Sequence, residues 1–196
     1  MKLWAKNTAS LKEVEQFTVG KDREFDLLLA PFDVLGNIAH AKMLATVGLL
    51  TGEEVALLTK ELREIYKTTL IASGEEAFTI HDNIEDVHSQ VEFLLTEKLG
   101  DVGKKIHSAR SRNDQVLVDI KLFLRSELEK TVQSIQAFFE LLITQSEKYK
   151  THLLPGYTHL QLAMPSSFGL WFGAYAESLV DDTIVLKAAY DVVNKN

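Results

Sequence analysis

Two segments of the chain gather residue types that could do chemistry. The first is "HSARSRNDQV", residues 107–116, which holds two arginines, two serines and an Asn-Asp pair. Guanidinium groups bind carboxylates through a planar fork of donors, and the start of a helix offers free N–H groups that favour an anion. The segment is therefore a candidate site for a small carboxylate or phosphate. A solvated loop whose arginines pair with nearby acids is an equally weighted alternative.

The second segment is "GYTHLQ", residues 156–161. Its histidine, His159, stands between Thr158 and Gln161. Imidazole titrates near pH 6.5 and can therefore accept or donate a proton at working pH. On composition alone an ordinary surface histidine is the commoner case. The hydroxyl and amide groups beside His159 could orient a substrate, and they favour an acid–base role.

Other chemistries find little support in the residues. Glu85 and His88 have the Glu-x-x-His spacing of di-iron helix bundles, but no other histidine has a glutamate three positions before it, so we expect no metal site. Cysteine is absent, which removes thiolate nucleophiles, and no Gly-x-Ser-x-Gly or P-loop pattern occurs. The basic residues between Lys104 and Arg112 have no aromatic residue among them for base stacking, which argues against a nucleic-acid site.

The bulk composition is that of a soluble globular protein. Apolar residues make up 46% of the 196 residues, and the formal net charge is −7. A negative balance argues against nucleic-acid or anionic-membrane partners, because both need a basic face. No stretch reaches the roughly 18 apolar residues of a membrane span, and "MKLWAKNTAS" lacks the apolar core of a signal peptide. We therefore expect a cytoplasmic protein without nucleic-acid or membrane partners.

Helix signals recur through the first half of the chain. Residues 22–30 predict a short helix, and Pro31 fits the first turn of the next one, where its missing N–H costs little. "TGEE" at 51–54 and "DNIE" at 82–85 have the form of capping boxes at helix starts. Gly100 is suited to ending the second of these helices.

The second half predicts two long helices. Apolar residues recur at steps of three and four over 114–149, and a further helix follows over about 166–193. A small domain cannot cover such long apolar stripes alone, so a long-helix bundle, shared within or between subunits, is expected. Strand signals are poor. We expect an all-α fold with an N-terminal helical domain over 1–110 and the start of a long-helix bundle over 111–196.

Several segments together resemble one family. "HSARSRNDQV", "LPGYTHLQLAMP" and "IEDVHSQVE", with "DVLGNIAHAKML" upstream, are similar to argininosuccinate lyase of the fumarase/aspartase superfamily, which includes the delta-crystallins. The resemblance runs from about Leu3 to the end of the chain. It implies a homotetramer around a bundle of long helices, with each active site assembled from three subunits. It also implies reversible cleavage of argininosuccinate to arginine and fumarate without metal or organic cofactor.

The resemblance assigns roles to the residues that match its motifs. His159 matches the acid–base histidine, and Thr158 matches a substrate-binding threonine. Asn113 would hold the substrate while Ser111 and Arg112 help to bind its carboxylates. The remaining positions assigned to the site are Gln161, His88 and His107.

Two departures from the family pattern bear on binding. Ser108-Ala109 stands where the family has Thr-Gly, and alanine adopts positive φ less readily than glycine. Asp22 stands where the family has a substrate-binding serine. An acid there would repel a dicarboxylate unless it were paired with Lys21 or Arg23.

The third departure is length, because family members are more than twice as long. The loop that carries the family's catalytic serine and lysine matches nothing here and is expected beyond Asn196. We therefore expect residues 1–196 alone to lack lyase activity. Two alternatives stay open: a non-catalytic structural or assembly protein of the same fold, or another fumarate-releasing lyase such as adenylosuccinate lyase.

Overall fold

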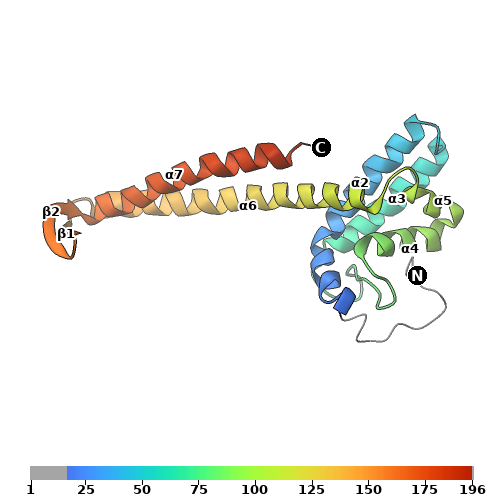
Figure 1. Cartoon of the computed structure of the whole chain (residues 1–196), viewed down its shortest axis with the longest axis horizontal. Coiled ribbons are helices and arrows are strands. Elements are labelled where there is room, and N and C mark those ends of the chain that lie inside the picture. Colours follow the sequence, from blue (N-terminus) through green and yellow to red (C-terminus); the bar gives the residue numbers. More distant parts are fainter. Residues whose placement is uncertain (1–16, 196) are drawn as a thin grey trace. The chain divides into compact units, whose positions relative to one another are not determined.

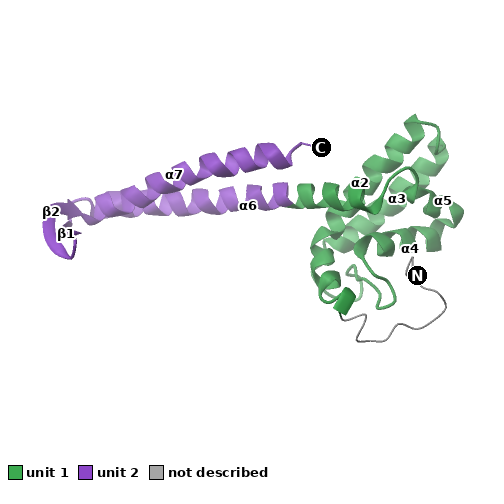
Figure 2. Ribbon diagram, in the orientation of Figure 1, with its two compact units in different colours: residues 1–123 green, residues 124–196 purple. Residues whose placement is uncertain are grey.

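The computed structural model describes residues 17–195, and these are mostly helical (Figure 1). Two compact units divide the chain, Met1–Phe123 and Leu124–Asn196 (Figure 2). The expected all-α class is confirmed, with one β-hairpin as the exception. The predicted domain boundary at 110/111 stays a prediction. The elements are α2 (Asp22–Thr46), α3 (Gly52–Thr69), α4 (Val87–Leu99), α5 (Asp101–Lys104), the 3₁₀ turn η1 (Lys105–His107), α6 (Arg112–Tyr149), β1 (Leu153–Thr158), β2 (Gln161–Ser167) and α7 (Phe168–Val193).

The first unit has a hydrophobic core formed where α2 packs against α3 and α4, and α4 against α5. Fully buried apolar side chains from these helices meet there. Burying each large aliphatic side chain contributes roughly 1.5–3 kcal/mol, so this core fixes the directions of α2 and α4. The buried members include Val34, Leu44, Leu58, Leu62, Val91 and Leu95.

Pro31 does not start a new helix, so that prediction was wrong. It lies inside α2, which runs without interruption from Asp22 to Thr46. Proline removes one helical hydrogen bond and normally kinks or ends a helix. Here Ala30 and Val34 are both fully buried on either side of it. Core packing thus holds the helix together across the missing bond.

Two of the three predicted helix boundary signals are confirmed. Thr51 and Glu54 form a reciprocal capping box at the start of α3, and α4 ends before Gly100, which has φ 59°. The predicted box at 82–85 was wrong. Asp86 is the actual cap of α4, and its carboxylate accepts from the Ser89 N–H at 2.6 Å. The short Asp86 side chain reaches the free N–H groups of the first turn directly.

Helix α2 is long and apolar enough, by length and composition, to cross a membrane. Its apolar side chains have another role here, because Ala30, Val34, Ala41 and Leu44 lie in the core of the first unit. A core helix of a soluble domain meets the same criterion. Helix α2 packs against α3 and α4 in the first unit.

The second unit is a pair of long helices with a hairpin between them. Helix α6 has 38 residues and α7 has 26, and both lie within two residues of the predicted ranges at each end. The start of α7 lies directly against the end of α6: a Cβ placed on Gly169 would lie 2.5 Å from the Lys150 Cα. The Ser146 hydroxyl donates to the Gly169 carbonyl at 2.7 Å.

The segment between the two long helices is an antiparallel hairpin, although strand signals in the sequence were poor. Strands β1 and β2 pair from Leu153–Ser167 to Thr158–Gln161. The two residues of the turn, His159 and Leu160, have φ values of 47° and 63°. Positive φ at both central positions matches the right-handed twist of paired strands, which is why such turns normally use Asn-Gly. The sequence has no Asn-Gly, so the hairpin was missed.

Candidate active site

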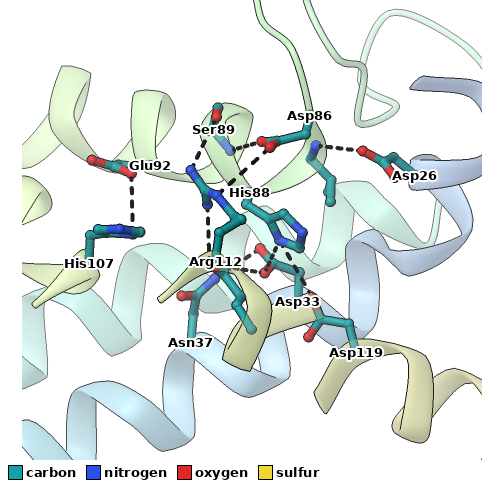
Figure 3. A network of polar contacts seen from close by, with 12 residues as sticks. Asp26, Asp33, Asn37, Asp86, His88, Ser89, Glu92, His107, Arg112 and Asp119 are labelled. Carbon is teal, nitrogen blue, oxygen red and sulfur yellow. Dashed lines mark hydrogen bonds and ion pairs between the residues drawn. The ribbon is translucent and has the colours of Figure 1, made fainter. Parts of the chain in front are cut away.

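The site in the first unit is built around His88. Asp86 caps α4 and places His88 in its first turn, where the ring is 4% exposed. Its Nδ1 lies 2.8 Å from the Asp33 Oδ1 of α2 (Figure 3). A carboxylate on one ring nitrogen fixes the orientation of the ring and leaves the other nitrogen, Nε2, for a ligand. The sequence assigned His88 a supporting role, and the geometry gives it a defined orientation.

Asp33 is the centre of a buried hydrogen-bond network (Figure 3). Its Oδ1 also accepts from Gln115 Nε2 of α6, and its Oδ2 accepts from Asn37 Nδ2 at 2.9 Å. The Arg110 guanidinium donates to the Asn37 Oδ1. Because burying a polar group is costly unless it is hydrogen-bonded, these donors stabilise the buried Asp33 side chain. The network ties α2, α4 and the first turns of α6 together.

A second carboxyl group, Asp119 of α6, lies beside this pair. Its Oδ2 is 3.5 Å from the His88 Nδ1, and its side chain is 1% exposed. Neither of its oxygens has a hydrogen-bond partner within the described part of the chain. Burial, and then the negative charge of Asp33, raises the pKa of Asp119 to about 9. Asp119 therefore carries a proton at neutral pH.

Arg112 opens α6 and points toward α4 (Figure 3). Its guanidinium donates to Gln115 Oε1 at 3.1 Å and to Ser89 Oγ at 3.3 Å. Its Nε lies 3.8 Å from the Asp86 carboxylate. The alternative in which this arginine pairs with nearby acids is thus partly observed. The charge contact is long and the side chain is 23% exposed, so Arg112 keeps capacity for an external anion.

A cavity of about 270 Å³ adjoins His88 and Arg112. Four carboxylates line it, those of Asp22, Asp26, Glu85 and Asp86. Asp22 does face this cavity, while Arg23 donates to the carbonyls of Ile84 and Asp82 at 2.8 Å. Burial raises the pKa of Asp26. The cavity therefore combines one arginine and one histidine with a largely acidic wall.

The other predicted residues of the Arg-Ser-Arg-Asn segment have local roles. Ser111 caps α6, because its hydroxyl accepts from the Asp114 N–H at 3.3 Å while Asp114 accepts from the Ser111 N–H at 2.8 Å. Asn113 is exposed. His107 is half-buried, with Nδ1 3.9 Å from Glu92 Oε2. None of these three lines the cavity beside His88.

The segment before α6 contains the expected strained alanine. Ala109 has φ 58°, where glycine is favoured. The preceding Ser108 carbonyl accepts from the His40 Nε2 at 2.8 Å. Burial lowers the pKa of His40, which keeps its ring neutral. This hydrogen bond fixes the loop that delivers Arg110 to the buried network.

Thr158, His159 and Gln161 lie together at the tip of the hairpin in the second unit. Thr158 pairs with Gln161, and His159 is in the two-residue turn between them. All three side chains are exposed. A turn built from two non-glycine residues at positive φ costs on the order of 1–3 kcal/mol per residue. Such strain is retained when the side chains displayed there serve a purpose.

Sequence reasoning missed the residues that hold His88 in place. Asp33 and Asn37 are four residues apart on α2, and Gln115 and Asp119 are four residues apart on α6; all four are buried. Polar residues at i and i+4 share one side of a helix. Two such polar pairs within apolar stripes could have indicated a buried polar cluster. What the sequence could not supply was which helices would meet.

Comparisons with known proteins identify the family of the chain. A family profile described as "Lyase" matches residues 2–196. The argininosuccinate lyase of Bacteroides fragilis is 60% identical over 196 residues, which is all of this chain and 43% of that protein. That of Phocaeicola vulgatus is 61% identical over the same length and share. The chain thus spans less than half the length of these curated relatives.

Solved structures share the fold at low identity. An EDDS lyase variant with bound fumarate matches with a TM-score of 0.71 and 23% identity, over 96% of this chain and 36% of that chain. A fumarate lyase:delta crystallin from Brucella melitensis, bound to cobalt, matches with a TM-score of 0.72 and 16% identity, over 93% and 43%. Given the profile match over nearly all its residues, the chain belongs to this lyase family, and it resembles the N-terminal part of argininosuccinate lyases.

Proposed function

We propose that the complete protein cleaves argininosuccinate to arginine and fumarate, as a step of arginine biosynthesis. The observation that carries this proposal is the 60% identity to the Bacteroides fragilis argininosuccinate lyase over all 196 residues. The cavity of the first unit supports it, because an arginine, an oriented histidine and several carboxylates converge there. A substrate with carboxylate groups and a guanidinium group suits such a mixed lining.

The reaction is an acid–base elimination. A base removes a proton from the succinyl carbon next to a carboxylate, and that carboxylate takes up the developing charge. The electron pair then forms the carbon–carbon double bond of fumarate as the C–N bond breaks. The leaving guanidine is strongly basic and takes a proton. Positioned groups that move these protons typically contribute about 10²–10⁴-fold in rate.

His159 is the residue we assign to proton transfer. Its exposed position at a hairpin tip leaves both ring nitrogens accessible to a substrate. Thr158 and Gln161 flank it on the paired strands and can hydrogen-bond to the same substrate. We leave open whether His159 acts as acid or as base, because the geometry of a bare hairpin is compatible with both.

Arg112 is the residue we assign to carboxylate binding. It begins α6, where the helix dipole adds to its positive charge. Its contact with Asp86, at 3.8 Å, is long enough to be replaced by a bidentate substrate carboxylate. Ser111 and Asn113 of the same loop are further candidates. The acidic wall formed by Asp22 and Glu85 suits the guanidinium end of the substrate.

We propose that active sites form between copies of the chain in a homotetramer. His88 and Arg112 belong to one compact unit, and His159 belongs to the other. An uninterrupted helix of 38 residues separates the two groups along the chain. The family resemblance, in which three subunits build each site, supports assembly from different copies.

The proposal is tested by measuring fumarate release from argininosuccinate by the complete protein, with residues 1–196 alone in parallel. We expect steady turnover by the complete protein and none by 1–196, because the serine loop implied by the resemblance lies outside it. Adenylosuccinate is the competing substrate. Turnover of adenylosuccinate alone would reassign the substrate, and turnover of neither would favour a non-catalytic role.

His159→Asn in the complete protein tests the assigned proton transfer. Asparagine keeps hydrogen-bonding capacity but does not titrate, so we expect kcat to fall by about 10²–10⁴-fold. His152→Asn is a matched control, because His152 is exposed and lies just before the hairpin. An equal loss of kcat in both variants would mean that His159 has no special role.

A further inference from the structure

The proposed mechanism makes no use of Asp119, although its side chain is only 1% exposed and lies beside His88. Asp119 comes from α6, Asp33 from α2 and His88 from α4, so three helices converge on this point (Figure 3). A Cβ placed on Gly36 would lie 3.4 Å from Asp119 Oδ1, which shows that the carboxyl lies directly against α2.

Asp33 and Asp119 differ sharply in how they are hydrogen-bonded. Asp33 accepts from His88, Gln115 and Asn37. Asp119 accepts from none of the described residues, and its Oδ2 lies 3.5 Å from the His88 Nδ1. One carboxyl group is thus fully hydrogen-bonded while the other is not. The arrangement suits one negative charge shared across the pair rather than two.

The charged groups around Asp119 are consistent with a single negative charge on the pair of carboxyl groups. Asp33 and Asp26 of α2 oppose a negative charge on Asp119, and Arg110, just before α6, favours it. His88 of α4 completes the surroundings. Burial has the largest effect and, with Asp33, outweighs Arg110. Asp119 is therefore an uncharged carboxylic acid at neutral pH, beside Asp33 and the imidazole of His88.

The three side chains also have the spacing of a metal site, since their ligand atoms lie within 4.8 Å of one another. Gln115 and Asn37 already donate hydrogen bonds to the Asp33 carboxylate that a metal would need. Gln115 Nε2 donates to the same Asp33 oxygen that contacts His88, and the positive charge of Arg110 lies nearby. A divalent cation would have to displace the Gln115 hydrogen bond and approach the positive charge of Arg110. The hydrogen-bonded arrangement is therefore the one the neighbours favour.

We propose that Asp119 is a positioning residue for His88: packed beside Asp33, it keeps the imidazole with Nδ1 toward the carboxyl pair and Nε2 available to a ligand in the acidic cavity. His88 lines that cavity together with Arg112. Asp119 lies on the same helix as Arg112, two turns further on. It thereby couples the orientation of the histidine to the helix that carries the anion-binding arginine.

The direct test is nitrogen NMR of the His88 ring in residues 1–196. The chain has six histidines, and His88→Gln identifies the signals of interest. Nitrogen shifts report which ring nitrogen carries the proton. We expect wild-type His88 to hold its proton on Nδ1 at neutral pH, with an inflection near pH 9 as Asp119 loses its proton. Asp119→Asn, which keeps an uncharged side chain of the same shape, should hold the same tautomer and lose the inflection.

Two further variants make the test specific. Asp119→Ala should leave the ring loosely held, so that its two nitrogen signals broaden or average. Asp101→Asn, at an exposed acid on α5, is the matched control and should change nothing. An unchanged His88 tautomer in Asp119→Ala would overturn the positioning role. An alkaline inflection that persists in Asp119→Asn would overturn its assignment to Asp119.

A kinetic arm rests on the proposed function and uses the complete protein. We expect Asp119→Ala to lower kcat by about 10–100-fold with KM within about twofold, as is typical of residues that orient a functional histidine. Asp119→Asn should stay within about threefold of wild type. A complete protein that releases no fumarate would defeat the proposed function, whereas the nitrogen spectra would still decide the role of Asp119. Equal loss of kcat in both variants would contradict positioning by an uncharged group.

Discussion

Asp119 is a residue whose charge state affects the stability of the whole first unit. Its pKa is about 9 in the folded chain, against 3.8 as its ordinary value. Between these two pH values the folded protein holds a proton that the unfolded protein releases. Stability from this residue is therefore complete below about pH 4 and is lost as pH rises toward 9, with a slope of at most about 1.4 kcal/mol per pH unit.

Asp119→Asn should remove this dependence, because asparagine does not titrate. We expect the variant to gain stability over wild type progressively from pH 5 to pH 8. The measurement is urea unfolding at each pH, and the quantity compared is the difference in unfolding free energy between the two proteins. Other titrating groups cancel in that difference. Parallel pH profiles for the two proteins would show that Asp119 is ionised in the fold.

Ala109 is strained for a different reason, since its backbone is in the left-handed region with φ 58°. Ala109→Gly should stabilise the chain by up to about 1 kcal/mol, because glycine avoids a penalty of roughly 1–2 kcal/mol but is more flexible when unfolded. The expected rise in Tm is about 2–4 °C for a chain of this size. Ala56→Gly, inside α3, is the contrasting variant and should lower Tm. A fall in Tm for Ala109→Gly would mean that the loop does not hold this conformation in solution.

At the scale of elements, sequence periodicity predicted what local interactions determine. The steps of three and four between Ile120 and Tyr149 predicted α6 because they are a property of one helix, and Thr51 with Glu54 marked a helix start for the same reason. Pro31 misled because packing on both sides of it outweighed its local preference. The hairpin was not predicted because its turn places His159 and Leu160 at positive φ, which these residues disfavour.

The residues of the candidate site also fall into those that the sequence could predict and those that it could not. Arg112, His88 and His159 could be chosen from the sequence because their chemistry and neighbours are visible in it. Asp33 and Asp119 are 86 positions apart in the sequence, and only the packing of α2 against the start of α6 brings them to His88. Contacts of that kind depend on helix directions, which periodicity does not determine.

The contact between α6 and α7 yields a matched pair of predictions. Gly169→Ala would place a Cβ 2.5 Å from the Lys150 Cα and 2.6 Å from the Ser146 carbonyl oxygen. Backbone atoms cannot yield easily, so we expect a loss of about 1–3 kcal/mol. Gly173→Ala, one turn further on, meets only the Ser146 hydroxyl at 3.5 Å. It should be neutral or stabilise the chain by up to about 1 kcal/mol through helix propensity.

Thermal unfolding of both glycine variants checks the packing of the second unit. The two substitutions add the same atom to the same helix, so differences in helix propensity largely cancel between them. A lower Tm for Gly169→Ala and an unchanged or higher Tm for Gly173→Ala would establish the close approach. Equal effects would indicate that the helices do not meet at Gly169 as described.

At the scale of the whole molecule, the two units differ in how well they cover their own apolar surface. Most of the buried apolar side chains belong to the first unit, whereas from Leu124 onward Leu142 and Ala176 are the buried ones in the described residues. Large apolar side chains of α6 and α7 stay exposed, among them Phe138 (50%), Leu141 (51%), Ile184 (67%), Val185 (69%) and Val192 (66%). Exposed apolar surface of this extent marks a site of association.

Residues 1–196 should therefore associate as concentration rises, with the long helices of the second unit as the contact. We expect sedimentation velocity to show a mean mass above 22.0 kDa that grows with concentration. Replacing Ile184 and Val185 together with serine should shift the association to about tenfold higher concentration or more, because roughly 25 cal/mol is lost per Å² of apolar surface no longer buried. Replacing Val47 and Leu49, which are 60% and 50% exposed in the first unit, removes similar apolar surface without touching α7. If that control weakened association as much as the α7 variant, association would be nonspecific hydrophobic contact and would not depend on the long helices.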